Sequence, residues 1–262
     1  MLTFIFGVLP YLVLAAFVWG WWQKSAGYLR TPVPYKIYLS PAPPGRAAAA
    51  VRPLLDLLAF RHLTWADKLA RIPSLAFHVC LALVLLRHLR YFLYPTPDWV
   101  MAFNWPGVAA GYLLPVLLLW LLLRRLCITS LISFSAPADF FILALLLALS
   151  LSGLALRLFF RVDLIEIKTA TLGLIRFSPY IPQNPGFFIV HFLLTLVFLA
   201  YYPFSKLIHF PALLFSSARN QADDLARKRH INPWDGPEIM DTGPSPGAKP
   251  GPQKYESGRS DA

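Results

Sequence analysis

The chain has 262 residues, of which 57% are hydrophobic and only 14% charged, and this composition excludes an ordinary water-soluble globular domain. Its 24 Lys and Arg outnumber its 13 Asp and Glu, but they are spread over the segments between apolar stretches, so we expect no nucleic-acid partner. The two cysteines, Cys80 and Cys127, form no CxxC or CxxCH motif. This excludes attachment of a c-type haem and an iron–sulfur ligand set within the chain.

Five apolar stretches are long enough to cross a bilayer as helices, which takes about 20 residues each. Backbone polar groups in lipid must be satisfied within their own segment, so each stretch is predicted to be a helix. We therefore predict an all-α membrane protein in which residues 1–214 form a membrane domain of five transmembrane helices. The predicted spans are residues 2–22, 72–93, 105–127, 137–160 and 187–210.

The segments between the spans differ in character. Residues 23–50 are rich in proline and are expected to be irregular. In Pro53–Leu69, apolar residues recur at near-helical spacing, which predicts an amphipathic helix on the cytoplasmic surface. Residues 94–106 and 162–186 are expected to be loops on the opposite side. Residues 215–262 are polar and predict a cytoplasmic tail whose first part binds a partner and whose last part, residues 243–262, is disordered by itself.

The distribution of basic residues predicts the topology. Eighteen of the 24 lie in residues 23–71, at Arg124 and Arg125, at Lys206 and after residue 210. By the positive-inside rule these segments are cytoplasmic. We expect a multi-pass protein of the cytoplasmic (inner) membrane whose N-terminus lies outside and whose C-terminus is cytoplasmic.

Four of the six histidines lie in two predicted spans, His78 and His88 in the second and His191 and His209 in the fifth. An ionisable side chain in hydrocarbon is costly and is by default a sign of function. The two spans run in opposite directions, so His88 and His191 share the outer depth, and His78 and His209 the inner depth. Two such pairs predict two b haems with two histidine ligands each, of the kind that transfers electrons.

The spacings add an expectation about geometry. On continuous α-helices, ten residues correspond to about 15 Å and 18 residues to about 27 Å. The ligands of each haem should then be offset along the membrane normal, with the irons about 21 Å apart. The alternative is a haem-free membrane anchor whose histidines only hydrogen-bond to neighbouring helices. A transporter is disfavoured because the chain shows no repeated half.

Four arginines, Arg87, Arg90, Arg157 and Arg161, lie near the predicted outer ends of spans two and four. They either extend to the interface beside lipid, or pair with haem propionates or a quinone headgroup. Both interpretations remain open at this stage. We expect quinone chemistry near the outer haem, and no catalytic residue is assigned.

The segments around the histidines resemble the gamma-subunit family of respiratory nitrate reductase. The resemblance rests on Phe77-His78 with His88, on His191 with Pro203-Phe204-Ser205-Lys206-Leu207-Ile208-His209, and on Leu9-Pro10-Tyr11, Arg124-Arg125-Leu126 and Ala138-Asp139. It implies that these histidines bind two b haems and that the subunit oxidises quinol. The chain departs from the family at Arg87, where the relatives have glycine, and in residues 94–106, which lack the lysine associated with their quinol site.

The tail carries a second resemblance. Residues 215–221 (FSSARNQ) and 229–234 (RHINPW) are similar to the cytochrome b subunit of the membrane complex associated with dissimilatory sulfite reduction. This similarity implies electron exchange between menaquinone and a cytoplasmic iron–sulfur protein resembling heterodisulfide reductase, within a complex of further membrane subunits. The candidate partner-binding residues are Arg227, Lys228, Arg229 and Trp234.

Two alternatives stay open within this class. The chain could instead be a gamma-type quinol-oxidising cytochrome b subunit of nitrate reductase, or of another quinone-linked complex. The sequence does not give the direction of electron flow. It also does not say whether the protein acts in sulfite reduction or in sulfur oxidation.

Overall fold

The computed structural model describes residues 1–31, 47, 51–52, 55, 68–183 and 185–209. Within these residues every regular element is a helix and no strand occurs, which confirms the all-α prediction. Four helices are long and apolar enough to cross a membrane, namely Phe4–Arg30, Arg71–Tyr91, Asn104–Cys127 and Pro137–Leu158. They match the first four predicted spans, whereas the fifth predicted span contains only a shorter apolar helix, Phe188–Phe204.

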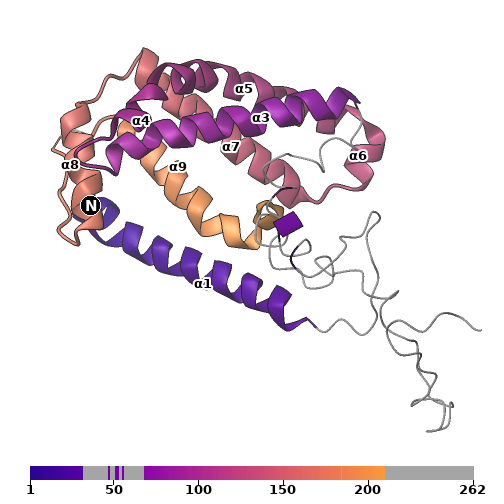
Figure 1. Cartoon of the computed structure of the whole chain (residues 1–262), viewed down its shortest axis with the longest axis horizontal. Helices are drawn as coiled ribbons and strands as arrows, with labels where there is room; N and C mark the ends of the chain where they lie inside the picture. Colours follow the sequence, from indigo (N-terminus) through magenta and orange to yellow (C-terminus); the bar gives the residue numbers. More distant parts are fainter. Residues whose placement is uncertain (32–46, 48–50, 53–54, 56–67, 184, 210–262) are drawn as a thin grey trace, which may run out of the picture. The chain divides into compact units, whose positions relative to one another are not determined.

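The long helices pack as successive neighbours, in the order α3, α5, α7, α9 and α1 (Figure 1). The elements are η1 (Phe4–Val8), α1 (Leu9–Arg30), α3 (Lys68–His88), η3 (Leu89–Tyr91), α4 (Asp98–Ala102), α5 (Asn104–Cys127), α6 (Thr129–Ser133), α7 (Pro137–Leu158), α8 (Leu164–Ile175), α9 (Phe188–Tyr201), η4 (Tyr202–Phe204) and η5 (Lys206–Ile208). A buried cluster joins α3, α5 and α7 through Phe77, Cys80, Ala110, Leu114, Leu118 and Leu146. In this order of neighbours, α5 and α7 connect α3, which carries His78 and His88, to α9, which carries His191.

Helix α1 is longer than predicted, because it continues to Arg30 instead of ending at residue 22. The residues after Trp22 contain no proline until Pro32, so nothing in them interrupts the helix. The residue before a proline is pushed towards extended backbone, and Thr31 is extended at φ −65° and ψ 118°. Its hydroxyl donates to Gly27 O at 2.8 Å and closes the last turn.

The fifth predicted span is not one continuous α-helix, so the estimate of about 27 Å between its histidines does not apply. Helix α9 ends at Tyr201 and is followed by two 3-10 turns, η4 and η5, separated by extended Ser205. Pro203 has no N–H to donate to an α-helical bond, which explains the break. The Ser205 hydroxyl donates to Tyr202 O at 2.8 Å and accepts from the N–H of Leu207 at 3.2 Å, which stabilises the turn.

Residues 162–186, expected to be a loop, contain the 12-residue helix α8. The side chain of Asp163 caps its N-terminus by accepting from the N–H of Ile165 at 2.8 Å and of Glu166 at 3.4 Å. After the helix ends, the chain folds back against Gly173, where a Cβ atom would lie 2.6 Å from Ser178 O. The prolines in this segment all follow the helix, so they do not prevent it.

Several predicted features lie outside the described residues. They include nearly all of the amphipathic segment Pro53–Leu69, the whole tail 215–262, and the candidate partner-binding residues Arg227, Lys228, Arg229 and Trp234. They remain predictions.

Candidate functional site

The structure brings the four predicted histidines together in the expected pairs. The rings of His78, in α3, and His209, directly after η5, have centroids 6.3 Å apart and planes at 85° to each other. Near the other end of α3, His88 lies close enough to His191, in α9, for the two rings to interact electrostatically. Each pair thus combines one residue from α3 with one from α9 or the segment that follows it.

The separation of His78 and His209 fits a shared metal centre. A metal–nitrogen bond of about 2.0 Å on each side, with about 1.1 Å from nitrogen to ring centre, places two axial imidazole centroids about 6 Å apart. The observed distance of 6.3 Å matches this geometry. The donor set also discriminates between metals. Among the described residues no group of three or more His, Cys, Asp or Glu side chains gathers as a bare zinc site requires. Iron in a porphyrin, in contrast, needs only axial protein ligands.

The tautomer of both α3 histidines is fixed by their own helix. His78 Nδ1 lies 2.6 Å from Ser74 O, and His88 Nδ1 lies 2.6 Å from Val84 O. A carbonyl oxygen only accepts hydrogen bonds, so each Nδ1 must carry the proton and donate it. In the neutral ring the lone pair is then on Nε2, and the hydrogen bond holds the ring orientation, as is usual for histidines that ligate metals.

The Nδ1 atom of His191 has its hydrogen-bond partner in a neighbouring helix. The hydroxyl of buried Ser152, in α7, donates to Leu149 O at 2.9 Å and lies 2.9 Å from His191 Nδ1. With the hydroxyl proton on this carbonyl, the oxygen can accept from Nδ1–H, and the lone pair of His191 is then on Nε2. The ring packs directly on α7, because a Cβ atom at Gly153 would lie 3.1 Å from His191 Cε1.

The segment that carries His209 is anchored by an ion pair. Lys206 Nζ donates to Asp139 Oδ2 at 2.7 Å, and the same oxygen accepts from the N–H of Ala136 at 3.0 Å. Asp139 is buried at the start of α7, whereas the Lys206 side chain is 70% exposed. The ion pair therefore ties η5 to α7 three residues before His209, which is itself exposed.

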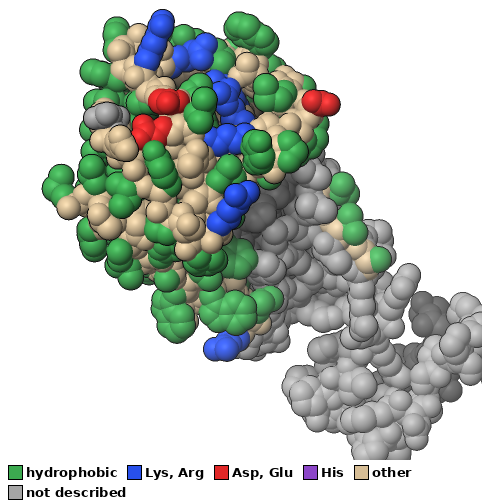
Figure 2. Space-filling view, turned by 90° about the vertical axis from the view of Figure 1, so that its left-hand side faces the viewer, with side chains coloured by type: hydrophobic (Ala, Val, Ile, Leu, Met, Phe, Trp, Pro, Cys, Tyr) green, Lys and Arg blue, Asp and Glu red, His purple; other side chains and the backbone are tan. Residues whose placement is uncertain are grey.

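Two of the four candidate arginines converge on one acceptor beside His88. Arg87 Nε and Arg90 Nη1 both donate to Asn104 Oδ1, at 3.2 Å and 3.3 Å. Both side chains are half-buried, and the Arg90 guanidinium lies 5.1 Å from the Tyr91 ring centroid. Lys and Arg side chains gather at this end of the bundle, which faces the viewer in Figure 2.

The other two candidate arginines behave differently. Arg157 is exposed but close enough to Arg87 for the two charges to interact, and Arg161 is exposed. The structure therefore brings Arg87, Arg90 and Arg157 together, and among the described residues Arg161 has no interaction with these three.

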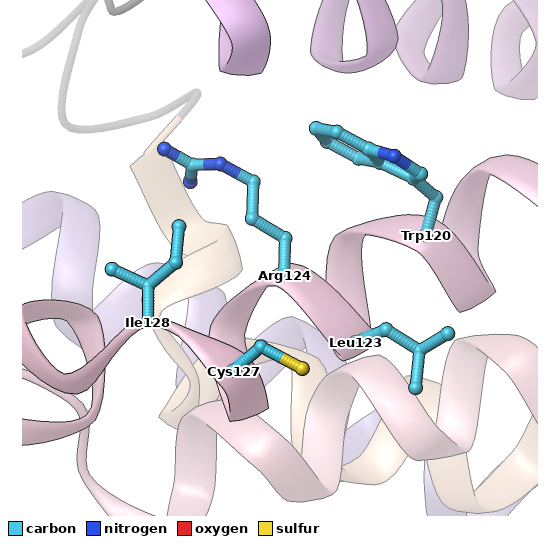
Figure 3. Close-up of a pocket in the computed structure, with 5 residues that line it drawn as sticks. All are labelled: Trp120, Leu123, Arg124, Cys127 and Ile128. Carbon is cyan, nitrogen blue, oxygen red and sulfur yellow. The ribbon is translucent and has the colours of Figure 1, made fainter.

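A shallow recess of about 310 Å³ lies at the C-terminal end of α5 (Figure 3). It is lined by Trp120, Leu123, Arg124, Cys127 and Ile128. None of the candidate histidines or arginines contributes to it, and its lining is almost entirely apolar. It is therefore not a candidate catalytic or haem site.

Sequence reasoning missed Ser152, Gly153 and Asn104. A serine next to a glycine within an otherwise apolar span was an available signal, because polar and small residues mark helix contacts in membranes. The partner that each would contact was not predictable, since it depends on which helices become neighbours.

Comparisons with known proteins identify the family of the chain. The family described as nitrate reductase gamma subunit matches residues 63–219, which contain all four histidines. Two curated relatives are named Hdr-like menaquinol oxidoreductase cytochrome b-like subunit. The protein of Archaeoglobus profundus is 30% identical over 90% of this chain and 84% of its own length. The protein of Archaeoglobus fulgidus is 31% identical over 91% of this chain and 86% of its own length. With these matches and its apolar helices, the chain belongs to the nitrate reductase gamma-subunit family of multi-pass membrane proteins.

Proposed function

We propose that this chain is a dihaem cytochrome b that exchanges electrons between a membrane quinone and a cytoplasmic iron–sulfur partner. The observation that carries the proposal is the pairing of four histidines at two places, three of them with the lone pair on Nε2. Bound haem b would supply one-electron transfer at each place. His88 and His191 would hold one group, and His78 and His209 the other.

The residues around each pair have separate tasks in this proposal. Val84 O, Ser74 O and the Ser152 hydroxyl orient the ligand rings and increase their basicity. The packing order of α3, α5, α7 and α9 sets the spacing between the rings of each pair.

We also propose a fifth membrane crossing made by α9 and η4. Phe188–Phe204 is apolar but lies at the short end of the roughly 17–25 residues that span a bilayer. The crossing places the C-terminus on the cytoplasmic side and the N-terminus outside, as the basic residues predict. A reporter fused after Ala262 that is active only outside the cell would contradict this topology.

The quinone is proposed to react near His88 and His191, beside the end of the bundle that α8 covers. The names of the relatives support menaquinone as the quinone and a complex related to heterodisulfide reductase as its setting. Arg157 and Arg161 are exposed at this end and are candidates for contact with a quinone headgroup. The resemblance of the tail supports service to sulfite or sulfur metabolism, with Arg227, Lys228, Arg229 and Trp234 binding the partner.

A second candidate function is a quinol-oxidising gamma subunit of nitrate reductase, which the family match supports. The identity of the proteins that co-purify with the chain separates the two. A partner resembling heterodisulfide reductase favours the first proposal, and a nitrate reductase catalytic pair favours the second.

The visible spectrum of the purified chain tests the dihaem proposal and its haem-free alternative. We expect reducible b-type bands and two haems per chain. The double variant His78→Ala, His209→Ala should retain one haem, and the double variant His88→Ala, His191→Ala should retain the other. Two haems in either double variant, or none in the unmodified chain, would refute the proposal.

A further inference from the structure

Three arginines, Arg87, Arg90 and Arg157, form a cationic cluster beside His88. Arg87 and Arg90 both donate to Asn104 Oδ1, so their guanidinium groups lie next to each other in spite of their like charge. Arg157 adds a third positive charge nearby. Among the residues that the structure describes, no Asp or Glu forms an ion pair with any of the three.

The side chain of Arg87 is held in place by α5. A Cβ atom at Gly107 would lie 2.7 Å from Arg87 Cβ and 2.8 Å from its Cδ, so the aliphatic stem lies directly on the backbone of α5. A packed stem is also found in an arginine that extends to the lipid headgroups, so the hydrogen bond of the guanidinium is the distinguishing contact. The bond to Asn104, together with the close contact at Gly107, fixes the guanidinium beside the helix end that carries His88.

The positive charges of this cluster favour binding of an anion. Half-buried positive charges near the membrane need an opposite charge, because a neutral acceptor such as the Asn104 amide offsets only part of their desolvation. A quinone headgroup is neutral and would leave the cluster uncompensated. A b-type haem carries two propionate carboxylates at one edge, and two adjacent arginines match two carboxylates through charge-assisted hydrogen bonds.

Resting on the proposed function, we infer that Arg87 and Arg90, positioned by Asn104 and Gly107, form the binding site for the propionates of the haem held by His88 and His191. Arg87 directly precedes His88, and Arg90 lies two residues after it. His88 would hold the haem iron, and the two arginines would bind the propionates and so orient the group.

A comparison of two porphyrins tests the inference. The full-length chain with His78→Ala and His209→Ala, which keeps a single haem site, is produced without haem and loaded in detergent. The probes are iron protoporphyrin IX and its dimethyl ester, in which both carboxylates are blocked. We expect the free acid to bind about tenfold or more tightly than the ester, since charge-assisted bonds are lost with the ester. Adding Arg87→Gln and Arg90→Gln should remove this preference.

The matched control is Arg176→Gln, which removes one positive charge from an exposed position at the end of α8. It should keep the preference for the free acid. If the preference is unchanged in the double arginine variant, the inference is wrong. If the chain with a single site binds neither porphyrin, the proposed function fails as well, so the two failures are distinguishable.

Two further measurements exclude other ligands and guard against misfolding. In the holoprotein with both haems, Arg87→Lys and Arg90→Lys should each shift the resonance Raman propionate bands of one haem only. Absence of any shift would overturn the inference. Binding that changes with anionic lipid in nanodiscs but not with porphyrin esterification would assign the cluster to lipid phosphate. An effect confined to the affinity of a menaquinone analogue would assign it to the quinone.

Discussion

The two histidine pairs are built on different kinds of backbone. His88 and His191 both lie within regular helices, α3 and α9, and both are half-buried. His78 also lies in α3, but its partner His209 is exposed and follows two 3-10 turns. The first pair is therefore positioned by the packing of helices on one another, whereas the second depends on local anchors of a short irregular segment.

The charges around the pairs differ in the same way. Beside His88 the half-buried Arg87 and Arg90 share one neutral acceptor, and beside His209 the cation Lys206 is matched by Asp139. The end of the bundle at His88 can thus bind an anionic group. At the end at His209 the positive charge of Lys206 is already neutralised by Asp139. The two histidine pairs therefore lie in different electrostatic surroundings: the cations beside His88 have no carboxylate partner among the described residues, whereas the cation beside His209 is paired within the chain.

The largest expected effect is the loss of the cytoplasmic partner when the tail is removed. Truncation after Ser217 should release the iron–sulfur partner completely and leave both haems bound, because the tail is proposed to contact the partner and not the haems. Truncation after Asp241, which keeps Arg227 to Trp234, is the control and should retain the partner. Co-purification and the haem content measured by pyridine haemochrome check the prediction. A partner that stays bound after the shorter truncation would make the tail dispensable.

The next effect should remove one haem only. In Gly153→Val the new side chain would occupy the position of the His191 ring, since even a Cβ atom lies 3.1 Å from Cε1. We expect haem content to fall from two to about one per chain, with the spectrum of the His78–His209 site retained. Gly111→Val, in α5, is the control because a Cβ atom there meets nothing within 4 Å. Equal haem loss in both variants would point to general misfolding instead.

A smaller effect is expected at the other pair. Asp139→Ala removes the acceptor of Lys206 and of the Ala136 N–H, and the loss of a buried charged acceptor costs about 1–3 kcal/mol. Thermal loss of the haem at His78–His209 should occur at lower temperature, while the other haem is unaffected. Asp163→Ala, which removes the cap of α8, is the control and should leave the His78–His209 site unchanged. Destabilisation of both haems by Asp139→Ala would show that the ion pair supports the whole bundle.

The smallest effect concerns the tuning of one ligand. Ser152→Ala removes the acceptor for His191 Nδ1–H and makes the imidazole a weaker donor, which favours reduced iron. A hydrogen bond worth about 1 kcal/mol corresponds to a rise of about 40 mV in the midpoint potential of this haem. Ser150→Ala is matched, because the Ser150 hydroxyl bonds Leu147 O on the same helix. A redox titration in which both variants give the same potential would remove Ser152 from the proposed ligand environment.

The sequence determined the helical class, the positions of the first four spans and the pairing of the histidines. These features follow from hydropathy and from the direction of each span, which are properties of the chain read residue by residue. The resemblance to the gamma-subunit family, carried by short motifs around the histidines, was confirmed by comparison. The haem ligation itself stays a prediction.

Only the tertiary structure decided the features that depend on which helices become neighbours. The break of the fifth span at Pro203 and Ser205 required the local hydrogen bonds, and helix α8 was hidden by the prolines that follow it. The contacts of Ser152 with His191 and of Asn104 with two arginines join residues 39, 17 and 14 positions apart. Periodicity reports which face of a helix is apolar, but it does not say which residue of another helix will meet that face. That choice is made by close packing.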